Sequence, residues 1–150
     1  MTHAINAYQE LEQRFERMSV FGEALSVLHW DMAVMMPPGG AEPRSEQLAL
    51  MRVMHHEMIT QPAIGDLLDA AEAMPLLDAW QQANVREMRR AQVHATAVPA
   101  DLVDAHSRAC SACETVWREA RKTSDFDAVR PALEHVLELT RQIGQAKADK

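Results

Sequence analysis

Residues 28–51 read LHWDMAVMMPPGGAEPRSEQLALM, and this stretch decides the fold. A nearly unbroken apolar run ends here at Pro37–Gly40, because proline lacks an N–H and disfavours helical geometry in the residue before it. The two glycines that follow the prolines allow a tight reversal of the chain. A charged segment with helical spacing begins near Ala41, immediately after the reversal. The sequence therefore predicts two helices that form a long hairpin closed at Pro37–Gly40.

Apolar residues before the reversal recur every three or four positions, a spacing that is typical of a helix packed against another helix. The predicted seam contains Tyr8, Leu11, Phe15, Met18, Gly22, Leu25, His29 and Met32. From Val20 onward most of the other positions are apolar as well. We therefore expect a partner surface to cover the second half of this helix.

Prolines and capping residues mark the later helix starts in the sequence. The predicted starts lie at Thr60 with Pro62, at Pro75, at Val98–Pro99 and at Pro131, with Ser124 and Asp127 resembling a capping box before the last. We find no alternating strand pattern and no repeat of fixed period. The sequence predicts an all-α bundle of five or six helices with short proline-marked turns, forming a single domain over residues 1–150.

The composition excludes several functional classes. A net charge of −7 and a pI near 5.4 argue against nucleic-acid binding, which needs a basic surface. No apolar run is long enough for a membrane span, and the N-terminus has no apolar segment of the signal-peptide type. The sequence contains only two cysteines, so we expect a cytoplasmic protein without a disulfide framework.

Two histidine motifs suggest metal chemistry, and both are weak. His106, Cys110 and Cys113 share one helix face, a spacing that could supply three zinc ligands, although cysteine in such a face more often packs as a small hydrophobe. His56-Glu57 begins the zincin pattern H-E-x-x-H, but the second histidine is missing and His55 points about 100° away. The sequence predicts core packing for the first group and no metal site for the second.

The sequence also contains a group of methionines that could form an adaptable groove for a peptide. They are Met32, Met35, Met36, Met51, Met54 and Met58. Methionine at helical spacing is more often a core residue, so the groove remains the less favoured interpretation.

The hairpin stretch resembles the N-terminal signature of the carboxypeptidase Taq family. The resemblance rests first on corner residues Trp30, Asp31, Met36, Pro37, Gly39, Gly40, Arg44 and Gln47. It continues through Val98-Pro99, Trp117–Arg121 and Asp125-Phe126 in the expected order. The family consists of all-helical metallocarboxypeptidases of the zincin type, and the resemblance implies that the corner residues are structural.

The resemblance also implies what this chain lacks. Family members are much longer, and their H-E-x-x-H helix and third metal ligand lie downstream of the region matched here. No catalytic residue and no metal ligand carry over, so zinc or cobalt is implied only for the full-length relatives. Independently of the family, we expect Asp31 to accept a hydrogen bond from Arg44 or from free helix N–H groups, and Trp30 to bury its ring over the turn.

The sequence therefore predicts the N-terminal helical region of a carboxypeptidase Taq-type enzyme, as a truncated or stand-alone chain that is inactive alone. The alternative is a helical interaction module that kept the fold and binds a partner. We also expect a homodimer. Without a partner, the second half of the first helix would expose a larger apolar area than soluble monomers usually show. The missing C-terminal catalytic region is the other candidate partner.

Overall fold

The computed structural model describes residues 6–149; residues 1–5, part of the segment on which the signal-peptide prediction rests, and Lys150 lie outside the described range. The described residues form α1 (Ala7–Val34), η1 (Pro38–Gly40), α2 (Ala41–Thr60), α3 (Pro62–Glu72), α4 (Ala79–Thr96), α5 (Ala100–Thr123) and α6 (Phe126–Ala148). Helix accounts for 88% of the structure, and no strand occurs in the described part of the chain. The predicted all-α class is confirmed.

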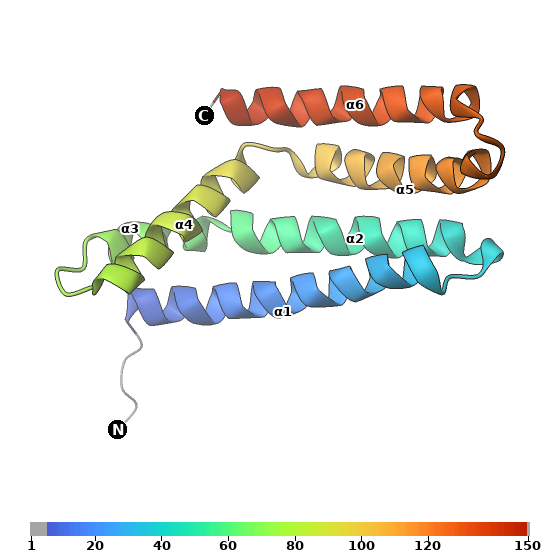
Figure 1. Ribbon diagram of the computed structural model, residues 1–150. Helices are drawn as coiled ribbons and strands as arrows, with labels where there is room; N and C mark the ends of the chain where they lie inside the picture. The colour runs from blue at the N-terminus through green and yellow to red at the C-terminus, as the bar shows by residue number, and fades with distance from the viewer. Residues whose placement is uncertain (1–5, 150) are drawn as a thin grey trace.

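Four of the helices lie in a row (Figure 1). α1 and α2 form the predicted hairpin, α5 packs against α2, and α6 packs chiefly against α5. α3 and α4 cover one end of the row, where both contact α1. Consequently α6 forms the outer edge of the bundle and has one main neighbour.

The main core lies at the end of the bundle covered by α3 and α4. Its buried residues are Tyr8, Leu11, Met18, Ile59, Ile64, Leu68, Ala71 and Val85. Asn84 of α4 donates a hydrogen bond of 2.9 Å to the hydroxyl of Tyr8, which satisfies the polar end of this buried ring. The first half of α1 is therefore anchored by three helices.

Two capping boxes fix helix starts that proline patterns did not reveal. Asn6 Oδ1 accepts from the Gln9 N–H at 2.9 Å, and the Gln9 side chain accepts from the Asn6 N–H at 3.1 Å. Asp78 and Gln81 repeat this arrangement at the start of α4. The predicted helix start at Pro75 is therefore wrong, because Pro75 lies in the turn before the Asp78 cap.

The start of α6 also differs from the prediction. Asp125, not Ser124, caps the helix, and its Oδ1 accepts from the Ala128 N–H at 3.1 Å. Ser124 instead ends α5 in the left-handed conformation, with φ of 58°. Pro131 lies inside α6 rather than at its start, so the last helix begins five residues earlier than Pro131 suggested.

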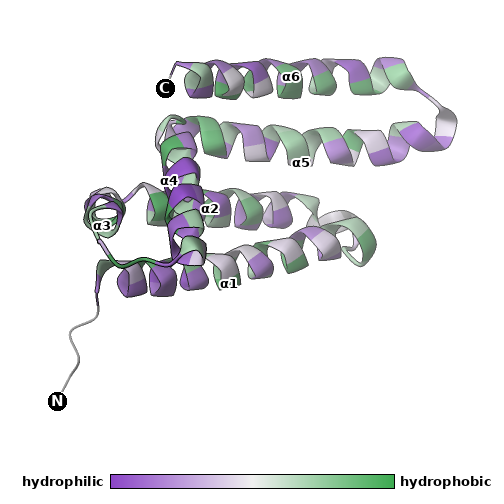
Figure 2. Cartoon of the chain, turned by 60° about the vertical axis from the view of Figure 1, so that its left-hand side comes forward, coloured by the Kyte–Doolittle hydropathy of each residue, from purple (hydrophilic) through white to green (hydrophobic). Residues whose placement is uncertain are grey.

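Some predicted inward positions face solvent. His29 is exposed although the predicted seam included it. Trp80, a large apolar residue of α4, is also 76% exposed. Figure 2 shows hydrophobic residues spread along several helices rather than confined to one central layer. Among the described residues, no helix is long and apolar enough to cross a membrane.

Candidate functional site

The hairpin corner is held by one arginine. Arg44 Nη1 of α2 lies 2.5 Å from Asp31 Oδ2 of α1 and donates to the Leu28 carbonyl oxygen at 2.8 Å. Arg44 Nε donates to Gln47 Oε1 at 3.0 Å. The expected contact between Asp31 and Arg44 is therefore present, and it links the last turn of α1 to the first turn of α2. The Asp31 side chain is about one third exposed, at 32%, so water reaches part of this ion pair.

The turn itself is closed by backbone contacts. The N–H groups of Met35 and Met36 donate to the Asp31 carbonyl oxygen, and the Gly40 N–H donates to the Pro37 carbonyl oxygen at 2.8 Å. A Cβ atom on Gly40 would lie 2.9 Å from Met36 Cγ. Glycine at this position therefore lets the Met36 side chain pack against the turn. These contacts fix the path of the backbone through the turn.

Trp30 does not bury its ring over the turn. The residue is 57% exposed, so that prediction is wrong. The reason is helical geometry. Trp30 precedes Met32 by two residues, a rotation of about 200° around the helix axis, so it lies on the side of α1 that faces away from the buried Met32. Trp30 instead joins exposed valines on that side of the helix.

The residues with metal-ligand spacing do not form a metal site. His106 Nε2 lies 3.2 Å from Thr140 Oγ1, and its imidazole contacts Cys110 Sγ at 3.7 Å. Within residues 6–149, no three His, Cys, Asp or Glu side chains gather in an arrangement that could hold a metal ion. The side chains present therefore do not fit the metal that the resemblance implies for full-length relatives. Burial raises the pKa of the Cys110 thiol, which is the reverse of what a reactive cysteine needs.

His56 has a structural role. Its Nε2 lies 2.8 Å from the Val98 carbonyl oxygen and 3.0 Å from the Ala95 carbonyl oxygen, which ties α2 to the end of α4. His55 packs near the Phe21 ring, with 6.3 Å between the ring centroids. The incomplete zincin pattern at His56-Glu57 thus serves helix packing.

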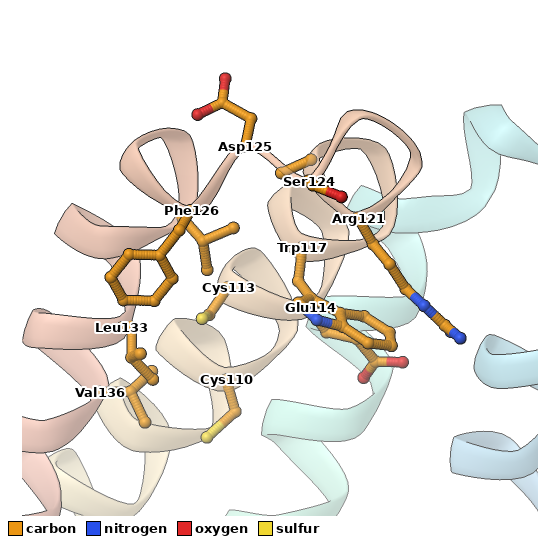
Figure 3. Close-up of a pocket in the computed structure, with 12 residues that line it drawn as sticks. Cys110, Cys113, Glu114, Trp117, Arg121, Ser124, Asp125, Phe126, Leu133 and Val136 are labelled. Atoms are coloured by element: carbon orange, nitrogen blue, oxygen red, sulfur yellow. The ribbon is translucent and has the colours of Figure 1, made fainter.

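The most prominent cavity lies between α5 and α6 (Figure 3). This groove has a volume of about 690 Å³ and is lined mainly by apolar side chains. Its walls include Cys110, Cys113, Trp117, Phe126, Leu133 and Val136. Sequence reasoning missed the groove, because its two walls are brought together only by the turn at Ser124.

Two aromatic side chains form the open rim of the groove. Trp117 is 45% exposed and Phe126 is 59% exposed. The Arg121 guanidinium lies over the Trp117 ring at 5.2 Å, and Arg130 lies 5.6 Å from the Phe126 ring centroid. These cation–π contacts hold the two rings in place without covering the apolar interior.

The methionine groove, the less favoured interpretation of the sequence, is not the groove observed. Met32 is buried at 4% exposure, whereas Met35, the C-cap of α1, is 65% exposed, so the methionines do not share one surface. The groove between α5 and α6 contains no methionine among its lining residues. Its apolar surface comes from aromatic, branched and cysteine side chains instead.

Comparison with known proteins places the chain in a family. The sequence model of the family "Carboxypeptidase Taq (M32) metallopeptidase" matches residues 10–150. Thermostable carboxypeptidase 1 of Thermus thermophilus is 36% identical over 140 residues, which cover 91% of this chain and 27% of the relative. The M32 carboxypeptidase of Deinococcus radiodurans R1 has a TM-score of 0.74 and 30% identity, with 96% of this chain and 29% of that chain covered.

The crystal structure of BsuCP shows the same fold, with a TM-score of 0.87 over 93% of this chain and 28% of that chain, at 24% identity. The chain thus spans little more than a quarter of the length of the relatives it matches. The resemblance carried by the hairpin signature is confirmed. The chain belongs to the carboxypeptidase Taq (M32) metallopeptidase family and corresponds to the N-terminal part of its members.

Proposed function

We propose that this chain forms the N-terminal helical part of a metallocarboxypeptidase and is inactive as a peptidase by itself. The observation that carries the proposal is the family match over residues 10–150, combined with coverage of only 27% of the Thermus thermophilus carboxypeptidase. The sequence contains no H-E-x-x-H motif, which supports inactivity. In the complete enzyme a bound metal, zinc or cobalt, would supply the chemistry that removes C-terminal residues from peptides.

The role of these helices is architectural: they would form one wall of the substrate cleft. The rest of the carboxypeptidase is the partner that we propose for the groove between α5 and α6. Three features support this assignment: α6 packs chiefly against α5, the groove interior is apolar, and Trp117 and Phe126 are exposed at its rim. Large aromatic side chains stabilise an interface strongly, because a second surface that covers them removes a large apolar area from water.

A chimera tests the proposal. Residues 10–150 replace the matched region of the Thermus thermophilus enzyme, and release of C-terminal residues from a peptide is measured with zinc or cobalt. We expect an active chimera and no activity from the 150-residue chain alone. A chimera that folds cooperatively but stays inactive would refute the architectural role, and metal-dependent activity of the purified chain alone would refute its inactivity.

Matched variants of the chimera test the groove. Phe126→Glu places a charge in the apolar rim, so we expect lower thermal stability and lower activity of the chimera. Trp80→Glu is the control, because Trp80 is 76% exposed and lies outside the groove. Equal effects of the two substitutions would show that the groove makes no special contact with the rest of the enzyme.

The second candidate function is a helical module that binds a protein partner through α1. Val20, Val27 and Val34 are 61%, 62% and 62% exposed, and Trp30 lies beside them. These residues, the α1 stripe, lie roughly opposite Met18 on the helix. A second copy of the chain is the partner we propose, because a twofold dimer buries the same stripe on both chains.

Light scattering coupled to size exclusion tests the dimer at micromolar concentration. We expect a dimeric mass and an interface above roughly 1,000 Å² in total. Val27→Glu should give a monomer, whereas Leu76→Glu, at a loop residue that is 90% exposed, should leave the mass unchanged. A monomeric mass for the unchanged chain, together with weak binding of a hydrophobic dye, would refute the dimer.

A cytoplasmic location is part of the proposal. Cys110 and Cys113 are both free thiols, which supports a reducing compartment. Fractionation of the source cells with an antibody against the chain would test this location, and recovery outside the cytoplasm would refute it.

A further inference from the structure

A second cavity lies where the C-terminal parts of α2 and α4 meet the first half of α5 and the end of α6, and Figure 1 shows these segments close together. Its volume is about 330 Å³. Five of its lining side chains are basic or can become so: Arg52, His56, His94, His106 and Lys147. No carboxylate lines this cavity, and its remaining lining side chains are apolar.

Arg52 and Lys147 of this basic cavity form no ion pair within residues 6–149. Eight other Lys and Arg residues form the ion pairs of the described structure. Arg52 is half-buried and makes no side-chain hydrogen bond within residues 6–149. This arrangement is unexpected in a chain with a net charge of −7, where carboxylates outnumber Lys and Arg by 22 to 15. Partial removal of water from a guanidinium costs free energy unless an anion pairs with it.

Two histidines of the cavity have different surroundings. His56 Nε2 donates toward two carbonyl oxygens, and its Nδ1 is buried without a hydrogen-bond partner among the described residues. Burial and the charge of Arg52 lower the pKa of His106, which means that the positive field of Arg52 reaches this ring.

We propose that the basic cavity binds a small oxyanion, namely a small molecule that bears a phosphate or a carboxylate group. Arg52 and Lys147 would supply the charge, and His94 would supply a ring N–H donor from α4. His106 would lie beside the anion, with its Nε2 held by Thr140 Oγ1. The volume of about 330 Å³ lies within the range of small-ligand sites, and the apolar remainder of the lining would cover the ligand's carbon atoms. This assignment is independent of the carboxypeptidase chemistry, because no residue of the cavity belongs to a catalytic motif.

Nuclear magnetic resonance of the histidine ring protons tests the site. The 150-residue chain is titrated with inorganic phosphate, and in parallel with succinate, against sodium chloride of matched ionic strength at constant pH. We expect saturable shifts of His94 and His106 and no saturable shift of His29 and His135, which are exposed and lie outside the cavity. Saturation by either anion supports the site and tells which oxyanion it prefers.

Two variants complete the test. Arg52→Gln should weaken anion binding at least about tenfold, the equivalent of one charge-assisted hydrogen bond. Arg86→Gln is the matched control, because Arg86 is an exposed arginine of α4 outside the cavity, and its binding should equal that of the unchanged chain. Circular dichroism confirms that both variants fold. Absence of saturable shifts with both anions, equal shifts of all four histidines, or unchanged binding by folded Arg52→Gln would overturn the proposal.

Discussion

Removal of the Asp31 carboxylate should destabilise the hairpin corner by about 1–2 kcal/mol, a value between those of exposed and buried ion pairs. The carboxylate is 32% exposed and its partner Arg44 is 17% exposed, so water screens the pair only in part. In Asp31→Ala, Arg44 would keep its bonds to the Leu28 carbonyl oxygen and to Gln47, and it would not become an isolated buried charge. The loss is therefore smaller than that of a fully buried pair.

For a chain of 150 residues, this loss corresponds to a melting temperature lower by about 3–6 °C. Differential scanning calorimetry of the unchanged chain and of Asp31→Ala measures the shift. Glu119→Ala is the control, because Glu119 is 75% exposed in its pair with Lys122 and should shift the melting temperature by less than about 2 °C.

A double-mutant cycle with Arg44→Ala isolates the pair from the other bonds of Arg44. We expect a coupling energy of about 0.5–1.5 kcal/mol between the two substitutions. A melting temperature of Asp31→Ala equal to that of the Glu119→Ala control, with zero coupling to Arg44→Ala, would refute the reasoning. The corner would then be held by its backbone contacts and by the bond from Arg44 to the Leu28 carbonyl oxygen.

Three further predictions concern the core, a helix end and pH. Leu68→Ala should cost about 2–5 kcal/mol in denaturant unfolding, because Leu68 is fully buried; a cost below about 1 kcal/mol would contradict the observed core. Ser124→Gly should raise the stability by up to about 1 kcal/mol, because glycine adopts the left-handed conformation without a Cβ penalty, and a lower melting temperature would show that the serine side chain makes a needed contact. Burial and Arg52 lower the pKa of His106 from its ordinary value of 6.5, so the unfolded chain binds this proton more tightly. The contribution of His106 to stability should therefore be complete above pH 6.5 and decrease as the pH falls through that value, and His106→Asn should weaken this decrease in thermal melts.

The hairpin could be predicted from the sequence because its signals are local. Two prolines and two glycines in succession leave few alternatives to a reversal, and the seam on each side has helical spacing. The hairpin in turn places the end of α1 beside the start of α2, so the contact between Asp31 and Arg44 was predictable across 13 positions of sequence.

Helix starts were less predictable where proline was the only signal. Proline is tolerated in a turn and early in a helix, so its presence fixes no boundary. Pro75 lies in a turn and Pro131 lies inside α6, whereas the true starts are set by the side chains of Asp78 and Asp125. The spacing between Asp78 and Gln81 is a capping-box signal that the sequence contains, and it could have located α4.

The candidate sites could not be predicted, because both depend on contacts between helices that are distant in sequence. The groove requires the faces of α5 and α6 to meet, and the basic cavity requires Arg52 and Lys147, which are 95 positions apart in the sequence, to lie near each other. Spacing along one helix drew attention to His106, Cys110 and Cys113, which do line the two cavities. That spacing does not indicate which helix lies opposite them.

Apolar periodicity identifies the faces of a helix that avoid water, but it does not identify the surface that covers them. Met18 and Val27 lie about 180° apart on α1, yet one is buried in the core and the other is 62% exposed. On α6, Phe126, Val129 and Leu133 share the face that lines the groove, and Val129 is buried whereas Phe126 and Leu133 are 59% and 44% exposed. Two apolar surfaces, the α1 stripe and the groove between α5 and α6, thus remain uncovered within the described residues. Large exposed apolar surfaces of this kind mark sites where another surface binds. Since α1 and α6 lie at opposite edges of the row of helices (Figure 1), the two surfaces can be covered by different partners. The dimer and the carboxypeptidase assembly that we propose are therefore compatible and can be tested separately, by Val27→Glu for the first and Phe126→Glu for the second.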